Sequence, residues 1–231
     1  MAEPVLARPL RRDRKQQRNR EALIDAAYYL MSRDGPDAVT MLQISEHADF
    51  GAGTVYNYFS SKDDLAVAVM DIAYLRLAER IHQVTEKFDD PVDSYVYSIR
   101  ATMITAASSK LWTRLLSRSV AAAEVMVRVM GPLMVPDLKK VRGTGIVKID
   151  NPELTWQLMT HAIIGFGIEV RQNSISMYTL DQSLVILLGM AGLEHDLAVK
   201  KAAKSWPPLP SDSDSRKSAR AISRKKSPAR P

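Results

Sequence analysis

The sequence predicts an all-α protein with a small N-terminal domain and a larger C-terminal helical domain. Of the 231 residues, 46% are hydrophobic but only 6% are aromatic, and glycine occurs at only 10 positions. A sheet protein would be richer in β-branched and aromatic residues. Apolar residues instead recur at the three- and four-residue spacing of a helix, as they do at Leu23, Ala26, Ala27 and Leu30.

The first predicted helix runs from Arg14 to Arg33. Residues 1–13, which precede it, contain two prolines and no helical periodicity, so we expect a disordered basic arm there. The Asp-Gly-Pro sequence at 34–36 ends the helix, because glycine suits the position after a helix and proline cannot continue one.

Two short helices joined by a tight turn are predicted between Thr40 and Phe59. Thr40 and Gln43 have the spacing of a capping box, in which side chains and backbone satisfy each other at the start of a helix. The Asp-Phe-Gly sequence at 49–51 breaks that helix, and we expect its phenylalanine to fill the angle between the two helices. The second helix is expected from Ala52 to Phe59.

The second of these helices has a polar face that packing alone does not explain. Val55 and Phe59 are four residues apart and should point inward together. The outward side is then formed by Thr54, Tyr56, Asn57 and Tyr58. A short helix with this much exposed hydrogen-bonding capacity is typical of a helix-turn-helix, whose second helix enters the major groove of DNA.

Positive charge is concentrated at the two ends of the chain. Residues 1–20 and 205–231 each carry seven basic and two acidic side chains, whereas the net charge of the whole chain is only +6. The segment between them is therefore mildly acidic. Basic ends can simply aid solubility, but beside a helix-turn-helix we favour binding to DNA phosphates, because lysine and arginine release condensed counterions.

A long helix is predicted to link the two domains. Ser61 and Asp64 form a second capping box, which opens a helix over about 62–87. The Asp-Asp-Pro sequence at 89–91 marks the start of the C-terminal domain, and Asn151-Pro152 supplies a cap and a first-turn proline for a later helix. The helices expected in this domain are at about 92–107, 109–119, 121–130, 136–142, 152–172 and 180–200.

The predicted domain borders follow from these elements. The helix-turn-helix domain spans 14–61, the linking helix 62–88 and the C-terminal domain 89–204. Beyond these, residues 205–231 contain seven serines, five prolines and a basic run, which leave little to bury. A disordered basic tail is expected there.

The sequence carries no pattern of a catalytic or metal site. There is no cysteine, and the four histidines are scattered without metal-binding spacing. No nucleophile elbow and no phosphate-binding loop occur, so we expect no enzyme activity, no cofactor and no metal. The longest apolar stretches are about half of the roughly 20 residues that span a bilayer. With no signal sequence at the N-terminus, a cytoplasmic protein without membrane contact is expected.

Residues across the N-terminal region agree in register with one known family. They are Thr40, Ile44, Ala48, Gly53-Thr54-Val55-Tyr56, Tyr58-Phe59, Ser61-Lys62 and Leu65. Over about 14–70 the chain therefore resembles the TetR family of bacterial one-component transcriptional regulators. Asp49 stands where the family usually has glycine, and Gly51 where serine or threonine commonly caps the second helix. Both residues are compatible with those conformations, so the departures concern which bases are read rather than the fold.

The resemblance implies a DNA-binding surface made by the second helix and its neighbours. Carried over by position, Thr40, Tyr56 and Lys62 would hold backbone phosphates. Base edges would be read by Thr54, Asn57 and Tyr58. The alternatives are that the two tyrosines pack and that the threonine at 40 is only a cap. The full predicted set is Arg14, Arg18, Thr40, Gly51, Ala52, Gly53, Thr54, Tyr56, Asn57, Tyr58 and Lys62.

The resemblance also implies a homodimer that reads an inverted repeat in double-stranded DNA, with the last two helices as the dimer surface. These helices are apolar over more than one face, and their glycines permit close approach. The alternative is that they are simply central to the monomer. The predicted interface residues are Gly165, Ile168, Leu184, Leu188 and Gly192.

The C-terminal domain of such a regulator would sense a small molecule. The residues predicted to line an effector pocket are Met103, Trp112, Leu116, Met126, Met130, Trp156 and Met159. Methionine suits a pliable pocket, although each could also be ordinary core. A polar end of the ligand could meet Arg100, Arg114 or His161.

The function predicted from the sequence is a ligand-responsive repressor, released from a palindromic operator by a small apolar effector. The alternative is a DNA-binding architectural or partner-binding protein of the same fold without an effector. The two basic ends keep this alternative open.

Overall fold

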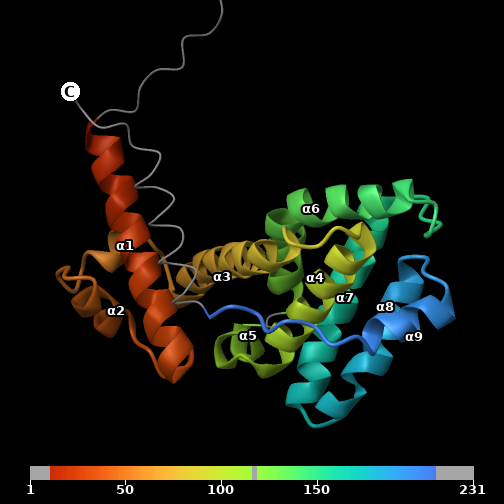
Figure 1. Ribbon diagram of the computed structural model, residues 1–231. Helices are drawn as coiled ribbons and strands as arrows, with labels where there is room; N and C mark the ends of the chain where they lie inside the picture. Colours follow the sequence, from red (N-terminus) through yellow and green to blue (C-terminus); the bar gives the residue numbers. More distant parts are fainter. Residues whose placement is uncertain (1–10, 116–118, 212–231) are drawn as a thin grey trace, which may run out of the picture. The chain divides into compact units, whose positions relative to one another are not determined.

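The computed structural model of the chain describes residues 11–115 and 119–211 (Figure 1). Every regular element in these residues is helical, which confirms the predicted all-α class. The elements are α1 (Arg11–Asp34), α2 (Met41–His47), the 3-10 turn η1 (Val55–Asn57), α3 (Lys62–Thr85), α4 (Pro91–Ser108), α5 (Lys110–Leu115), α6 (Ser119–Gly143), α7 (Pro152–Arg171), the 3-10 turn η2 (Met177–Thr179), α8 (Leu180–Met190) and α9 (His195–Ala202). No helix in the described part of the chain is long and apolar enough to cross a membrane.

The described residues fold as two compact units, whose border lies between Val69 and Met70 within α3. The N-terminal unit has a small core whose side chains are at most 1% exposed, namely Leu23, Ala27, Met31, Ile44, Val55, Phe59 and Leu65. The apolar spacing predicted for the first helix therefore forms its buried face. α1 begins three residues earlier than expected, so the end of the predicted basic arm is helical. Residues 1–10 of that arm lie outside the described residues.

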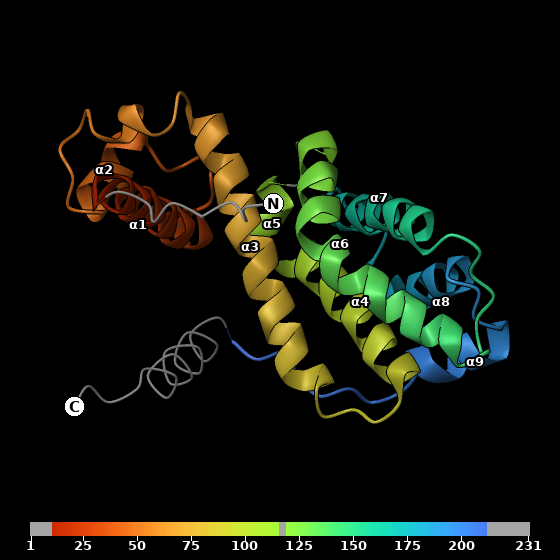
Figure 2. The same cartoon turned by 90° about the horizontal axis from the view of Figure 1, so that it is seen from above.

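Helices α4, α6 and α7 form the centre of the C-terminal unit, and Figure 2 shows α6 lying alongside α4 and α7. α8 and α9 pack against each other and against α4. α7 begins as predicted, because the side chain of Asn151 accepts a hydrogen bond from the Leu154 N–H at 2.9 Å and Pro152 occupies the first turn. Fully buried large side chains of this unit include Tyr95, Ile99, Met103 and Trp156.

Helix α6 continues through a segment in which the sequence predicts a loop and a separate helix at 136–142. It is one helix of 25 residues with Pro132 and Pro136 inside it. Each proline removes one amide donor, but both lie on the exposed side of the helix. The opposite side buries Met130, Met134, Leu138 and Val141, each at most 3% exposed. This continuous apolar face outweighs the two missing hydrogen bonds.

The single helix expected at 180–200 is two helices, α8 and α9, separated by a tight turn. Gly192 in this turn has a φ of +76°, a conformation that favours glycine. A β-carbon at Gly192 would lie only 2.8 Å from the carbonyl oxygen of Lys148. The close approach of a distant loop therefore decides where α8 ends, and helical periodicity alone does not reveal it.

Residues 205–211, which we call the strap, lie against the C-terminal unit (Figure 1). The ring of Trp206 packs against Phe88 and Tyr97, with centroid distances of 5.8 and 6.0 Å. Its Nε1–H donates to the backbone carbonyl of Lys201 at 3.3 Å. The expectation of disorder is therefore wrong for the strap, because one tryptophan supplies burial that the surrounding serines and prolines lack.

The strap also contacts α3. The Nε–H of Arg80 donates to the backbone carbonyl of Pro210 at 2.6 Å. The strap therefore contacts both α3, through Arg80, and α4, through Tyr97. The rest of the expected tail, 212–231, lies outside the described residues.

An ion cluster holds the end of α9 against the start of α4. Lys201 contacts Asp90 at 2.6 Å and also contacts Asp93, which Lys204 approaches from the other side. Burial alone would raise the pKa of Asp93, but the hydrogen bonds and charges of the two lysines outweigh it and hold that pKa below its ordinary value. Burial likewise opposes protonation of Lys201, and its two carboxylate partners nevertheless raise its pKa.

Replacing Gly192 by alanine should destabilise the C-terminal unit. The left-handed conformation costs a residue with a β-carbon about 1–2 kcal/mol, and displacing the Lys148 backbone adds to this cost. We therefore expect the free energy of unfolding, measured by urea denaturation, to fall by at least about 2 kcal/mol. The control is Gly143→Ala, where no atom lies within 4 Å of the new β-carbon. Equal effects of the two substitutions would contradict the close-approach explanation.

Asp93→Asn should make the free energy of unfolding less dependent on pH in acid. The folded-state pKa of Asp93 lies below its unfolded value of about 3.9, so its stabilising contribution is complete above that value and disappears as the pH falls through the folded-state pKa. The side chains of Asp93 and Lys201 are 14% and 16% exposed. For a pair at this depth we expect a loss of about 1–2 kcal/mol near neutral pH and a smaller loss in acid.

Urea denaturation near neutral pH and in acid measures both effects of Asp93→Asn. Asp137→Asn is the control, because its ion pair with Lys140 is at the surface and should contribute less than about 0.5 kcal/mol. A loss of stability for Asp93→Asn that is the same at both pH values would contradict the proposed role of its charge.

Candidate functional site

The predicted helix-turn-helix consists of α2, a left-handed turn and the segment after it. The Thr40 hydroxyl accepts from the Gln43 N–H at 3.2 Å, and the Gln43 side chain accepts from the Thr40 N–H at 2.8 Å. This confirms the predicted capping box. Asp49 adopts a φ of +60°, the conformation that its residue type tolerates. The Phe50 N–H then donates to the Ser45 carbonyl at 2.8 Å and closes the turn.

The segment 52–59 does not form the helix that the sequence predicts. Its helical part is the single 3-10 turn Val55–Asn57, and no side chain caps that turn. Glycine, β-branched residues and tyrosines dominate the segment, and all of these have low helix propensity. Phe50, expected to fill the angle before it, is only half-buried. The segment is therefore held by the surfaces on which it packs.

Two buried side chains anchor the segment 52–59, as predicted. Val55 and Phe59 are both at most 1% exposed. α1 adds two contacts that the sequence does not indicate. The Arg20 guanidinium lies 5.1 Å from the centroid of the Phe59 ring, and Asn19 donates to the Tyr58 hydroxyl at 3.2 Å. Each contact joins residues 39 positions apart, so no local pattern could have indicated it.

The outward side of this segment offers two freely exposed polar side chains rather than four. Tyr56 is 60% exposed and Asn57 is exposed as well. Thr54 and Tyr58 are half-buried, and the Tyr58 hydroxyl already accepts a hydrogen bond from α1. The packing interpretation therefore applies to Tyr58. Tyr56 and Asn57 are the side chains that can reach a ligand without rearrangement.

Lys62 opens α3 directly after this segment. The Ser61 hydroxyl accepts from the Asp64 N–H at 3.1 Å, while the Asp64 carboxylate accepts from the N–H of Ser60 at 3.0 Å. In the predicted capping box the Asp64 carboxylate would accept from the N–H of Ser61, but it accepts from the N–H of the preceding residue, Ser60. Lys62 Nζ donates to the Asp37 carbonyl at 3.2 Å, which holds the ammonium group beside the turn between α1 and α2.

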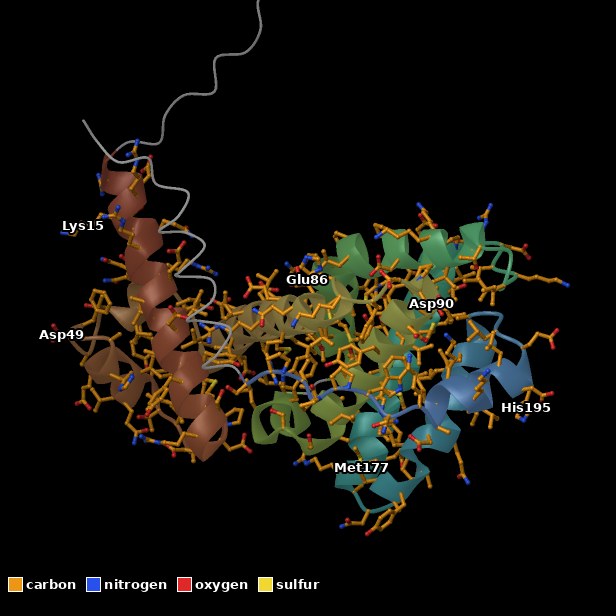
Figure 3. All side chains as sticks on the ribbon, in the orientation of Figure 1. Lys15, Asp49, Glu86, Asp90, Met177 and His195 are labelled. Carbon is orange, nitrogen blue, oxygen red and sulfur yellow. The ribbon has the colours of Figure 1, made fainter. Side chains whose placement is uncertain are left out.

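Basic and small residues complete the exposed surface of the N-terminal unit. Figure 3 shows Lys15 and Asp49 directed away from the body of this unit. Exposed basic residues on the first turns of α1 are Arg12, Arg14, Lys15 and Arg18. Gly51, Ala52 and Gly53, before the 3-10 turn, are also exposed. This surface combines positive charge with a backbone that bears no bulky side chains.

The residues predicted to line an effector pocket are part of the interior of the C-terminal unit. Those that are at most 6% exposed are Met103, Trp112, Met126, Met130, Trp156 and Met159, whereas Leu116 lies outside the described residues. Of the residues expected at a polar end, Arg100 pairs with Asp181 and His161 is exposed. The side chain of Arg114 lies outside the described part of the chain.

Three of the five predicted dimer residues are used within the chain. Leu184 and Leu188 are fully buried, because α8 packs this side against α9, α4 and α7. Gly192 lies against the backbone of Lys148. These three residues therefore make contacts within one chain, and their contact with a second copy stays a prediction. Gly165 and Ile168 are half-buried.

One side of α7, which includes the predicted Gly165 and Ile168, and the side of α8 opposite Leu184 and Leu188 are largely apolar and exposed, and we call them the apolar face. On α7 it follows an alternating four- and three-residue spacing through Leu154, Leu158, His161, Gly165 and Ile168. Leu154 and Leu158 are 50% and 53% exposed. On α8, Ile186 and Met190 are 68% and 42% exposed. An open groove of about 570 Å³ between α6 and α7 borders this face and shares three of its α7 residues.

Comparison with known proteins agrees with this architecture. Residues 23–69 match the family model described as bacterial regulatory proteins, tetR family. The HTH-type transcriptional repressor KstR of Rhodococcus jostii (strain RHA1) is 37% identical over 65 residues, which cover 28% of this chain and 31% of that protein. Residues 23–69 belong to the TetR family. The matched region contains both helices of the motif and the start of α3, so the N-terminal unit is a TetR-type helix-turn-helix domain.

The TetR-type fold extends beyond the region of strong sequence similarity. The HTH-type transcriptional regulator HbdR of Aromatoleum sp. (strain CIB) is 27% identical over 111 residues, 48% of each chain. The crystal structure of RolR in complex with resorcinol superposes with a TM-score of 0.77 at 26% identity and covers 86% of this chain and 100% of that one. The alignment with KstR, by contrast, spans only about a third of that repressor's length.

Proposed function

We propose that this TetR-family protein is a transcriptional repressor that binds an inverted-repeat operator as a homodimer and leaves it when a small molecule binds the C-terminal unit. The observation that carries the proposal is the exposed pair Tyr56 and Asn57, on a turn that Val55 and Phe59 anchor in the core. A turn anchored in this way presents hydrogen-bonding groups at a constant position, as base reading requires. The name of KstR as a repressor favours repression over activation.

Each part of the N-terminal surface has a role in this proposal. Asn57 reads a base edge, since an asparagine side chain can bond adenine N6 and N7 together. Tyr56 and Lys62 hold backbone phosphates, and Arg14 and Arg18 add attraction that does not depend on sequence. The exposed glycines before the turn let the backbone approach the duplex closely. Residues 14–61 therefore recognise DNA.

We assign dimer formation to the apolar face of α7 and α8. Its alternating four- and three-residue spacing is the pattern by which helices pair along their length. Exposed Leu154, Leu158, Ile186 and Met190 would be covered by the same residues of a second copy. Two copies place two helix-turn-helix motifs about one DNA turn apart, which accounts for an inverted repeat.

The proposed effector acts by favouring a state that does not fit the operator. A ligand shifts a conformational equilibrium only by its difference in affinity for the two states. Residues 89–204 would sense the ligand, and the helix over 62–88 is the covalent route to the DNA-reading residues. The presence of resorcinol in the RolR structure supports a small-molecule effector here. Catalysis, cofactors and metals have no part in this proposal, and the place of action is the bacterial cytoplasm.

Asn57→Ala should relax the sequence preference of the operator, whereas Lys62→Ala should weaken binding to every sequence. Loss of a base contact removes about 1–3 kcal/mol of discrimination at one base pair. Loss of a phosphate contact lowers the slope of log affinity against log salt by about 1. Selection of bound fragments from genomic DNA, followed by titration at several salt concentrations, measures both changes.

Lys200→Ala is the charge-matched control, because it removes the same charge from an exposed position on α9 and should leave DNA binding unchanged. An unaltered preference in Asn57→Ala would show that this residue does not read a base. Footprinting with the same protein tests the architectural alternative. A repressor protects a few palindromic sites, whereas an architectural protein protects DNA broadly.

Leu158→Glu should convert the dimer into monomers. A carboxylate buried without a partner costs several kcal/mol, enough to raise the dissociation constant at least about a hundredfold. Sedimentation velocity measures the state of the protein over a range of concentrations. Val199→Glu on α9, where the valine is 44% exposed, is the control and should remain dimeric. A dimeric Leu158→Glu variant would exclude the apolar face as the dimer surface.

A further inference from the structure

Buried polar groups near the middle of α7 lack adequate hydrogen-bond partners. The Nε1–H of Trp156 and the hydroxyl of Thr160 have none, although both residues are at most 1% exposed. The hydroxyl of fully buried Tyr95 on α4 donates to the thioether sulfur of Met159 at 3.0 Å, and sulfur is a weak acceptor. Trp156, Met159 and Thr160 lie within about one turn of α7. We call these four residues the donor cluster.

The buried serine and threonine hydroxyls of α4 are satisfied, whereas the buried Tyr97 hydroxyl, beside the strap, also lacks a partner. Ser98, Thr102 and Thr105 on α4 donate to backbone carbonyls one turn earlier, at 2.7, 2.7 and 2.8 Å. Thr160 makes no such bond to its own helix. An unpaired buried donor is unfavourable, and folded proteins keep few of them. Trp156 and Thr160 lie one turn apart, beside the weakly bonded Tyr95 hydroxyl, so an oxygen-bearing ligand at this point would satisfy all three groups.

Helix α6 has an unusual structure beside the donor cluster. A β-carbon at Gly131 would lie 3.4 Å from Trp156 Nε1, so the glycine leaves the indole edge uncovered by a side chain. Pro132 and Pro136 remove two amide donors from the next turns of α6, which weakens the hydrogen-bond ladder there. The same three-helix core buries flexible side chains that can repack around a ligand, namely Met103, Met126 and Met130.

The fully buried residues of the C-terminal unit, among those that the structure describes, include no charged side chain. In the described part of the C-terminal unit, the buried polar residues are Ser98, Thr102, Thr105 and Thr160. Arg100 is paired with Asp181 and His161 is exposed, so neither supplies a buried charge. A carboxylate or ammonium group would have to be buried there without a counter-charge, which is strongly unfavourable.

We propose that the donor cluster binds the effector, and that the effector is a compact, uncharged aromatic molecule bearing hydroxyl groups. This inference rests on the proposed function and names the chemical class of its ligand. Trp156 donates to one ligand oxygen, and the Thr160 hydroxyl can donate or accept at another. The aromatic ring packs among methionine sulfurs, which contact ring edges favourably.

Two contacts connect this site to α3. The Tyr74 hydroxyl on α3 donates to the Ala122 carbonyl on α6 at 3.0 Å, and Arg128 on α6 pairs with Asp71 on α3 at 2.6 Å. A ligand that displaces α6 beside Trp156 therefore changes two bonds that position α3. This gives the ligand a physical route to the helix that continues into the DNA-reading unit.

Isothermal titration calorimetry of the full-length protein with phenol, resorcinol and 3-hydroxybenzoate tests the inference. We expect both neutral phenols to bind, and 3-hydroxybenzoate to bind at least about tenfold more weakly because of its carboxylate. Trp156→Phe and Thr160→Val remove one hydrogen-bonding group each, and each should weaken resorcinol binding about threefold to tenfold. Without ligand, Thr160→Val should not lower the melting temperature, because its hydroxyl has no bond to lose.

Thr102→Val and Trp206→Phe are the matched controls, because each removes a group that is already bonded to a backbone carbonyl. Both should lower the melting temperature and leave the affinity for resorcinol unchanged. The inference is overturned if neither phenol binds, if the carboxylate binds as tightly as resorcinol, or if Trp156→Phe and Thr160→Val both keep full affinity.

Operator binding is measured separately. Operator binding without phenol binding contradicts this inference alone, and phenol binding without operator binding contradicts the proposed function alone.

Discussion

Burial of Val55 and Phe59 in the N-terminal core is the interaction on which the orientation of the proposed DNA-reading residues depends. Each buried side chain of this size contributes about 1.5–3 kcal/mol, whereas a lone 3-10 turn with low helix propensity has little stability of its own. The positions of Tyr56 and Asn57 are therefore set by packing. Asn19 and Arg20 on α1 extend that packing to the residues beside them. A change in the core of α1 would consequently alter the presented surface without touching it.

The C-terminal unit has an ion-paired edge and unpaired buried donors at its centre. At the edge, the ion cluster of Lys201 and the strap hold α9, α4 and α3 together. At the centre, Trp156 and Thr160 have no hydrogen-bond partner. The proposed sensor would benefit from this distribution, because a ligand that satisfies the centre gains binding energy while the edge keeps the unit folded. In that proposal, different residues of one unit provide stability and the response to ligand.

Helix starts could be predicted from the sequence because their signals are local. Thr40 with Gln43, and Asn151 with Pro152, cap α2 and α7 as expected. Whether a helix continues or ends at an internal position could not be predicted in the same way. α6 passes through its two prolines because a long apolar face is buried behind them, and α8 stops where the distant Lys148 approaches Gly192. In both places tertiary contacts outweigh local propensity.

The sequence by itself determined the all-α class, the TetR-type motif and its two anchors, because caps, apolar spacing and residue register are properties of neighbouring positions. Only the tertiary structure decided which side of α7 and α8 is available to a second copy. Leu184 and Leu188 are buried while Ile186 and Met190 are exposed, although all four are equally apolar. The structure alone also shows which buried donors lack partners. The exposed side of α7 and α8 and the unpaired donors both depend on contacts between distant parts of the chain, which a local sequence pattern does not indicate.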